Sequence, residues 1–561
     1  MGSELGITPE SKPQAQYTPV SIWWACWAGV WTTAVVLGMI YLIANRNMPT
    51  LRIRGLALSL SAIVLLHLYW ASVQFGVMIG PIMPGDAQYW IMGTYLPCGI
   101  ALFHASNSRF LHVAKHQRKF AHHSSRITEP VPEGKPRGGL LGRFRRMEYT
   151  RRIIILVGIA MVFQIFLTIL MWVISRKWHS SWGIPGTEVT GTPMEQATKQ
   201  GQGWEWWPSV FWQVFWAWVV APIVLWKSRH IRDTQGWRVQ TIGCAIANLH
   251  ATPMWLIALY VPAMEVVNQY WIPPQWICLS IWIMEIFTVF LPCWEVMRHH
   301  ALRQETFNAI EQWESKVKAA GSDARSLSSI PTMVESMMSG WKSTNGSVDT
   351  TTSRDSILTM GALEHVLERN PAPLQKFSAL NDFSGENVAF LTSVADWKNS
   401  LPKPLRENDG PIDDNMKELL HERFNRALHI YVQFISVRLA EFPVNISSQD
   451  LRKLENIFEG PARALYGEKR DVVDPVTPFE APSYPMKSLS SPSFANGSQV
   501  SLHPVSSDDR VQFWGEVPEE FGPTVFNDAE KSIKYLVLTN TWPKFVKSRR
   551  SSTDSVKEEA I

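Results

Sequence analysis

The sequence predicts an all-α protein in two parts, a bundle of seven membrane-spanning helices followed by a cytosolic, all-helical domain. Two observations support this prediction. Residues 20–297 contain apolar runs long enough to cross a bilayer, which takes about 20 helical residues. Beyond residue 357, apolar residues recur instead at the three- and four-residue spacing of amphipathic helices that pack around a core.

Composition limits the class of protein. A chain of 561 residues exceeds the length of one ordinary domain, and its net charge of +4 gives no indication of a nucleic-acid partner. All five cysteines lie inside apolar stretches, which excludes an extracellular domain held together by disulfides. The polar leader, residues 1–19, lacks the basic start of a secretory signal peptide and is expected to be the extracellular N-terminus.

Seven apolar runs form the predicted transmembrane domain, residues 20–297. Lys and Arg concentrate in the first, third and fifth connections, so these face the cytoplasm and the C-terminus lies inside. We expect an integral protein of the plasma membrane, with tryptophans such as Trp23, Trp206 and Trp207 at the lipid interfaces. The basic third connection serves topology and contact with anionic membrane lipids, or else a G-protein or phosphoinositide contact. The seven runs are residues 20–44, 56–79, 87–105, 153–175, 206–226, 241–261 and 271–297.

Glu285 lies near the midpoint of the seventh predicted span, where an ionisable side chain is costly. Two interpretations remain open. Glu285 could form a ligand or proton site with His67, Asn248 or His250, which would take an unidentified extracellular ligand. Alternatively, it is a buried, protonated carboxyl group that is hydrogen-bonded to neighbouring backbone.

The remaining segments divide the second half of the chain. Residues 298–357 comprise an amphipathic helix, which lies along the membrane or extends the seventh span, and a Ser/Thr-rich linker. The helical domain covers residues 358–548 and is interrupted by a Pro/Ser-rich, disordered insertion at about 467–522. In the tail, residues 549–561, Ser551 and Ser552 follow two arginines and form a candidate phosphorylation site for a basophilic kinase.

Four motifs occur in order within the helical domain. The first is a helix start at residues 383–390, with Ser384 as the expected N-cap and Glu386 in the first turn. The others cover residues 430–435, 526–533 and 542–548, and each continues a stripe of apolar residues at helical spacing. The stripes comprise Phe390, Val394, Trp397, Leu420, Phe424, Leu428, Tyr431, Ile435, Phe526, Ala529, Ile533 and Leu536.

Together these motifs resemble the family of regulators of G-protein signalling (RGS), all-helical domains that bind the GTP-bound α subunit (Gα) of heterotrimeric G proteins. The resemblance implies that this domain accelerates GTP hydrolysis by holding the switch regions of Gα, so the protein is not itself an enzyme and needs no cofactor or metal. It also implies that Asn540 and Lys544 stand where the family has Asp and Arg, which would weaken the contact. The Gα-contacting residues implied are Glu386, Asn387, Asn456 (in a loop), Leu536, Asn540, Thr541 and Lys544.

The layout as a whole resembles seven-transmembrane RGS receptors of fungi and plants. The inner end of the third span and the seventh span lack the activation motifs of rhodopsin-like receptors. Two other function classes remain. One is a membrane scaffold that binds Gα without accelerating hydrolysis. The other is a transporter with a regulatory module, for which the sequence shows no inverted repeat or catalytic motif.

Overall fold

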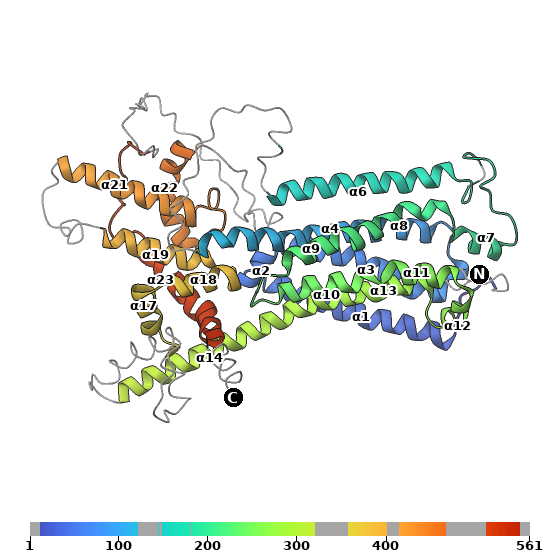
Figure 1. Cartoon of the computed structure of the whole chain (residues 1–561), viewed down its shortest axis with the longest axis horizontal. Coiled ribbons are helices and arrows are strands. Elements are labelled where there is room, and N and C mark those ends of the chain that lie inside the picture. Colours follow the sequence, from blue (N-terminus) through green and yellow to red (C-terminus); the bar gives the residue numbers. More distant parts are fainter. Residues whose placement is uncertain are drawn as a thin grey trace. The chain divides into compact units, whose positions relative to one another are not determined.

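The computed structural model describes residues 12–121, 144, 149–179, 181–319, 357–400, 414–466 and 512–549 (Figure 1). Within these ranges the chain is helical, and the only β-pairing is an isolated bridge between Ser175 and Ile184. The all-α prediction is therefore confirmed for the described residues. The linker at 320–356, most of the predicted insertion, and the candidate phosphorylation site at Ser551 and Ser552 lie outside them.

The chain forms two compact units. Among the described residues, unit 1 contains 12–114, 144, 149–179 and 181–298, and unit 2 contains 115–121, 299–319, 357–400, 414–466 and 512–549. The boundaries fall inside two long helices, α4 (Ala87–Gln117) and α14 (Leu291–Ala319). Unit 2 therefore includes two short segments that the sequence analysis placed with the membrane part or the linker.

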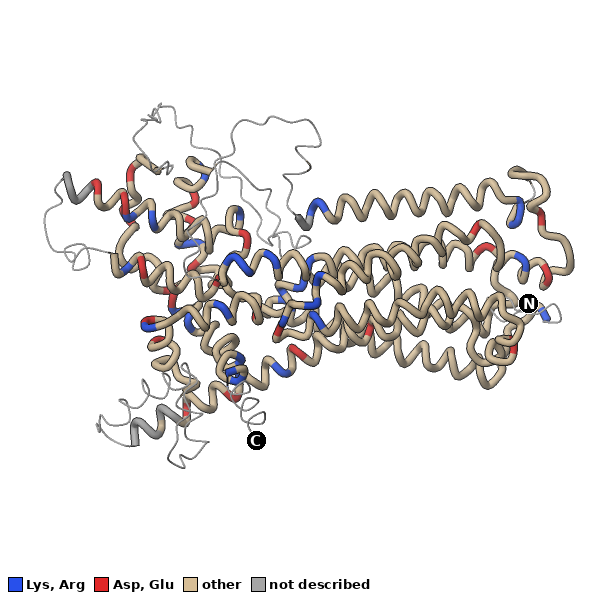
Figure 2. The backbone as a smooth tube through the Cα atoms, in the orientation of Figure 1, with Lys and Arg blue, Asp and Glu red and all other residues tan. Residues whose placement is uncertain are grey.

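Unit 1 is a bundle of long apolar helices, whose middle stretches carry almost no charged residues (Figure 2). Six helices in the described part are long and apolar enough to cross a membrane: Pro19–Ala44, Leu56–Ile82, Arg151–Ile174, Trp204–Ser228, Trp237–Tyr260 and Pro273–Gln312. They match six of the seven predicted runs and support membrane insertion. The elements are α1 (Pro19–Ala44), α2 (Pro49–Arg54), α3 (Leu56–Ile79), α6 (Tyr149–Ile174), α7 (Pro193–Gln200), α8 (Trp207–Val214), η4 (Phe215–Val220), α9 (Ala221–Ser228), α10 (Trp237–Leu249), α11 (Ala251–Tyr260), α12 (Glu265–Asn268), α13 (Pro273–Glu285), η6 (Ile286–Phe290) and α14.

The remaining predicted run, residues 87–105, forms the first part of α4, which is less apolar than the six. Helix α4 is enclosed by its neighbours: Tyr95 is its only exposed residue between positions 87 and 114. The surrounding helices also donate hydrogen bonds to the backbone of α4. The indole of Trp212 donates to the carbonyl of Pro97 at 3.0 Å, and the hydroxyl of Thr168 donates to the carbonyl of Gly93 at 3.1 Å. A helix that contacts protein rather than lipid does not need a uniformly apolar surface.

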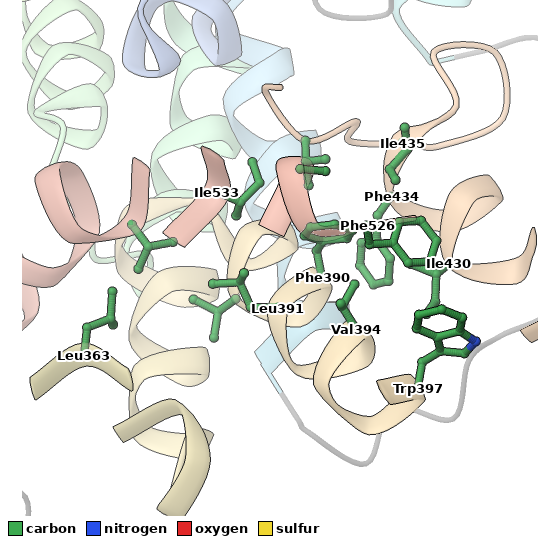
Figure 3. Packing of buried hydrophobic residues seen from close by; sticks show 14 of the residues in the cluster. Leu363, Phe390, Leu391, Val394, Trp397, Ile430, Phe434, Ile435, Phe526 and Ile533 are labelled. Carbon is green, nitrogen blue, oxygen red and sulfur yellow. The ribbon is translucent and has the colours of Figure 1, made fainter. Parts of the chain in front are cut away.

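Unit 2 packs its helices around one aromatic core. Residues from all four sequence motifs meet there, including Phe390, Phe434, Phe526 and Trp542, which are at most 1% exposed. Figure 3 shows Phe390, Phe434 and Phe526 in this core. The predicted apolar stripes therefore lie in the core, except for Leu420 and Leu536, which are only partly buried. The elements are η2 (Arg118–Ala121), α17 (Met360–Arg369), α18 (Ala372–Phe377), η7 (Ser378–Asp382), α19 (Gly385–Asn399), α21 (Asp414–Ile430), η8 (Tyr431–Ile435), α22 (Ser448–Tyr466), α23 (Asn527–Leu536), η9 (Val537–Thr541) and a final helix over residues 542–549.

One open alternative is decided and one expected boundary changes. The amphipathic segment after residue 297 continues α14, which is the predicted extension of the seventh span, and Phe307 stacks on Tyr535 within unit 2 with ring centroids 5.9 Å apart. The predicted insertion ends before Phe513. That residue exchanges two backbone hydrogen bonds with the Asn425 side chain, at 2.7 and 3.1 Å, and Phe521 packs against Phe424 at 5.1 Å.

Candidate functional sites

The start of α19 is built by an abrupt change of chain direction. Phe383 has φ of 51°, a left-handed conformation that is rare outside glycine, and it is held by its buried side chain (1% exposed). Ser384 occupies the N-cap position, but its side chain does not cap the helix as predicted. Its hydroxyl donates instead to Asp382 at 2.9 Å, so the first amides of α19 need other partners.

Asp382 is the centre of a buried polar network. Its fully buried carboxylate accepts from Lys544 Nζ at 2.7 Å and from the Thr541 hydroxyl at 2.8 Å, in addition to Ser384. Burial alone would raise the pKa of Asp382, but the Lys544 ammonium and the three hydrogen bonds outweigh it and hold that pKa below its ordinary value. The network joins the last motif to the first.

Asn540 and Lys544, the two departures from the family pattern, belong to this network. Asn540 Oδ1 accepts from Lys544 Nζ at 2.9 Å and lies 2.8 Å from His299 Nε2. The carboxylate that pairs with Lys544 is that of Asp382, from η7. Leu536, another predicted contact residue, packs partly buried against the core.

Glu386 and Asn387 are buried: only 8% of the surface of Glu386 and 5% of that of Asn387 are exposed. Gln117 Nε2 donates to Glu386 Oε2 at 2.8 Å, and Asn387 Nδ2 lies 3.4 Å from Glu386 Oε1. Asn387 Oδ1 is buried without a hydrogen-bond partner among the described residues. An unpaired buried acceptor costs about 1–3 kcal/mol, a cost that functional sites often retain.

Asn456 does not lie in a loop. It is an exposed residue in the middle of α22, whereas the resemblance implies a loop asparagine. The loop between η8 and α22 contains a different exposed asparagine, Asn445, next to Val444, whose amide donates to the carbonyl of Phe434 at 2.8 Å. The sequence analysis did not single out Asn445, although Pro443 close before it marks a loop.

In unit 1, His67 of α3 and Glu285, the last residue of α13, come together as predicted. His67 Nδ1 lies 2.8 Å from Glu285 Oε1, its Nε2 lies 2.9 Å from the Thr32 hydroxyl, and the Trp31 indole donates to Glu285 Oε2. The partners of Glu285 are therefore side chains from two other helices and not neighbouring backbone. Among the described residues no Lys or Arg forms an ion pair with Glu285, so this is a buried acid–imidazole pair, which can hold or pass a proton.

The other two predicted members of that site bond elsewhere. Asn248 Nδ2 donates to the carbonyl of Cys244 at 2.9 Å, one turn back in its own helix, and His250 occupies the junction between α10 and α11. Neither joins the Glu285 pair. The predicted four-residue ligand site therefore reduces to His67 and Glu285.

A tryptophan-lined cavity of about 220 Å³ lies between α1, α3 and α13, and the sequence analysis did not foresee it. Trp27 stacks on Trp31 at 5.8 Å, and Trp31, the indole donor to Glu285, packs edge-on against Trp282 at 5.5 Å. The only amide side chains in its wall are Gln74 and Gln275, which bond to each other at 2.9 Å. Trp23, which was predicted to lie at a lipid interface, also lines this cavity. The arrangement can hold a small molecule against indole rings.

Comparisons with protein-family models, with curated proteins and with solved structures find no match to this chain. In unit 2 the structure joins Asn540, Thr541 and Lys544 in the network around Asp382, and it holds Glu386 and Asn387 together at the start of α19.

Proposed function

We propose that this protein is a membrane-embedded regulator of heterotrimeric G-protein signalling, whose unit 2 binds GTP-bound Gα and accelerates its GTP hydrolysis. One observation carries the proposal. Segments far apart in the sequence, each of which resembles part of the RGS pattern, contribute to one core, and Ser384, Thr541 and Lys544 of the first and last segments meet at Asp382. We define the candidate Gα surface as Glu386, Asn387, Asn445, Asn540 and Lys544.

Acceleration requires no catalytic group from this protein. Gα carries an arginine and a water-orienting glutamine of its own, so a regulator needs only to hold the mobile switch regions in their transition-state arrangement. Asparagine side chains suit that task, because their amides donate and accept hydrogen bonds without charge. Asn387 Oδ1 has no hydrogen-bond partner among the described residues, so it would accept such a bond once it is uncovered.

The membrane part completes the proposal. We propose that α4 is a seventh span, which places the N-terminus outside and unit 2 in the cytoplasm of a plasma-membrane protein, where Gα is found. The supporting observation is that α4 is as long as its neighbours and packs among them, with Tyr89, Met92, Leu96 and Phe103 in the same apolar cluster as α3, α11 and α13. With six spans, both termini would lie on one side.

Single-turnover GTP hydrolysis tests the function. Candidate Gα subunits, loaded with GTP, are mixed with the full chain in nanodiscs at saturating concentration. Asn387→Ala combined with Asn445→Ala should slow the stimulated rate at least tenfold, because each hydrogen bond made only in the transition state is worth about 1–3 kcal/mol. Asn456→Ala in α22 is the matched control, and equal effects of the two changes would remove the site assignment.

A Gα-binding scaffold is the second candidate. It is favoured by the internal engagement of Asn540 and Lys544, since a Lys that already pairs with Asp382 has fewer donors left for Gα. The scaffold predicts tight binding to the GDP–aluminium fluoride form of Gα with no acceleration in any variant. Measuring affinity and hydrolysis on the same preparations separates the two functions.

A further inference from the structure

The last residues of α4 together with η2, residues 115–121, lie on the start of α19. We call them the covering segment. Gln117 is fully buried: its Oε1 accepts from the amide of Gly385 at 3.0 Å, and its Nε2 donates to Glu386 at 2.8 Å. One side chain thus satisfies an otherwise open amide at the helix start and the carboxylate beside it.

Phe120 extends this contact. Its carbonyl accepts from Gln375 Nε2, which also donates to the carbonyl of Gly385 at 3.0 Å. A Cβ at position 385 would lie 2.8 Å from that of Phe120, so only glycine permits this approach. The ring of Phe120 also packs against that of Phe434, with centroids 6.2 Å apart. Phe434 belongs to the motif at residues 430–435, which precedes the loop that contains Asn445.

The covering segment also binds the loop that holds Asn445. Glu441 in that loop pairs with His116, and with Lys119 at 3.1 Å, while Phe442 packs edge-on to Phe120 at 6.4 Å. Burial would raise the pKa of Glu441, but the hydrogen bond and charge of His116, and then Lys119, lower it to about 2. A basic segment is thus seated between two acidic positions, Glu386 and Glu441.

We infer that the covering segment is an internal competitor of Gα. It occupies the candidate Gα surface at the α19 start and beside the Asn445 loop, so Gα binds only after the segment has moved away. The inference rests on the proposed function. His299 of α14 covers Asn540 in the same way. Because α4 and α14 both begin in unit 1, a rearrangement of either helix would be passed along the chain to the covered surface.

The test compares the full chain in nanodiscs with two variants. Gln117→Ala removes both bonds to the α19 start, and Arg118→Ala, an exposed change in the next residue, is the matched control. The probe is Gα bound to GDP and aluminium fluoride. Gln117→Ala should bind about tenfold more tightly than the wild type, and Arg118→Ala should not. Phe120→Ala serves as a second release variant.

Hydrogen exchange provides a readout that needs no Gα. The amides at the start of α19 should exchange about tenfold faster in Gln117→Ala than in Arg118→Ala, because Gly385 loses its acceptor. Unchanged exchange would overturn the inference whatever Gα does. If exchange rises but Gα affinity stays equal in all variants, the inference is also wrong, while the proposed function survives. If exchange rises and no variant binds any Gα, the proposed function fails and the competitor role fails with it.

Discussion

Replacing Lys544 by methionine should destabilise unit 2 by about 3 kcal/mol. The change keeps most of the aliphatic stem and removes the ammonium group that lies 2.7 Å from the fully buried carboxylate of Asp382. Breaking a buried ion pair from one side costs about 3–5 kcal/mol, because the remaining charge is left uncompensated. The Thr541 and Ser384 hydroxyls still bond to Asp382, which places the expected cost at the lower end.

Hydrogen exchange of the full chain measures this change inside unit 2, without requiring the whole chain to unfold in one step. The reporter is α19, whose Phe390 and Val394 are fully buried in the core. Some amides exchange only when unit 2 opens. For these amides, a loss of about 3 kcal/mol lowers the protection about a hundredfold or more. Lys453→Met is the control, since Lys453 pairs with Asp528 on the surface, with both side chains more than half exposed.

The double variant Asp382→Asn with Lys544→Met should recover most of the loss, because no buried charge remains.

The pKa of Asp382 fixes how the stability of unit 2 depends on pH. In the wild type the folded pKa of Asp382 is lowered, so its contribution is present above the unfolded pKa of about 3.9 and is lost as pH falls through the folded pKa. Without Lys544, burial raises that pKa, and the stability gap to the wild type should narrow as pH falls toward about 4. The reasoning is refuted if Lys544→Met changes protection no more than Lys453→Met.

Three further predictions concern other parts of the molecule. Deleting residues 468–510 should leave unit 2 folded, whereas a deletion continued through Phe521 should abolish its cooperative melting, because Phe513 and Phe521 pack on the core. Equal melting of the two deletion variants would contradict that packing. A tag after Ile561 should resist protease added outside sealed, right-side-out vesicles, and cleavage there would exclude the proposed seven-span topology. His67→Phe should lower the melting temperature in detergent by about 5 °C, since a buried carboxylate short of a partner costs about 1–3 kcal/mol. Glu285→Gln should lower the melting temperature less. The reverse order would mean that Glu285 is neutral and does not depend on His67.

The sequence by itself determined the helices and the residues they bury. The predicted run 56–79 coincides with α3, and the apolar stripe Phe390, Val394 and Trp397 lies in the core of unit 2. Both succeed for the same physical reason. The helical period and the length needed to cross a bilayer are local properties, so they are written in consecutive residues.

Only the tertiary structure decided which distant side chains meet. Glu285 pairs with His67, 218 positions earlier, and Asp382 rather than residue 540 supplies the carboxylate for Lys544. The same holds for Gln117 and Glu386, which lie 269 positions apart and turn an expected open surface into a covered one. Periodicity places a residue on a face of its own helix, but it contains no information about which other helix covers that face, because this depends on how all the helices pack at once.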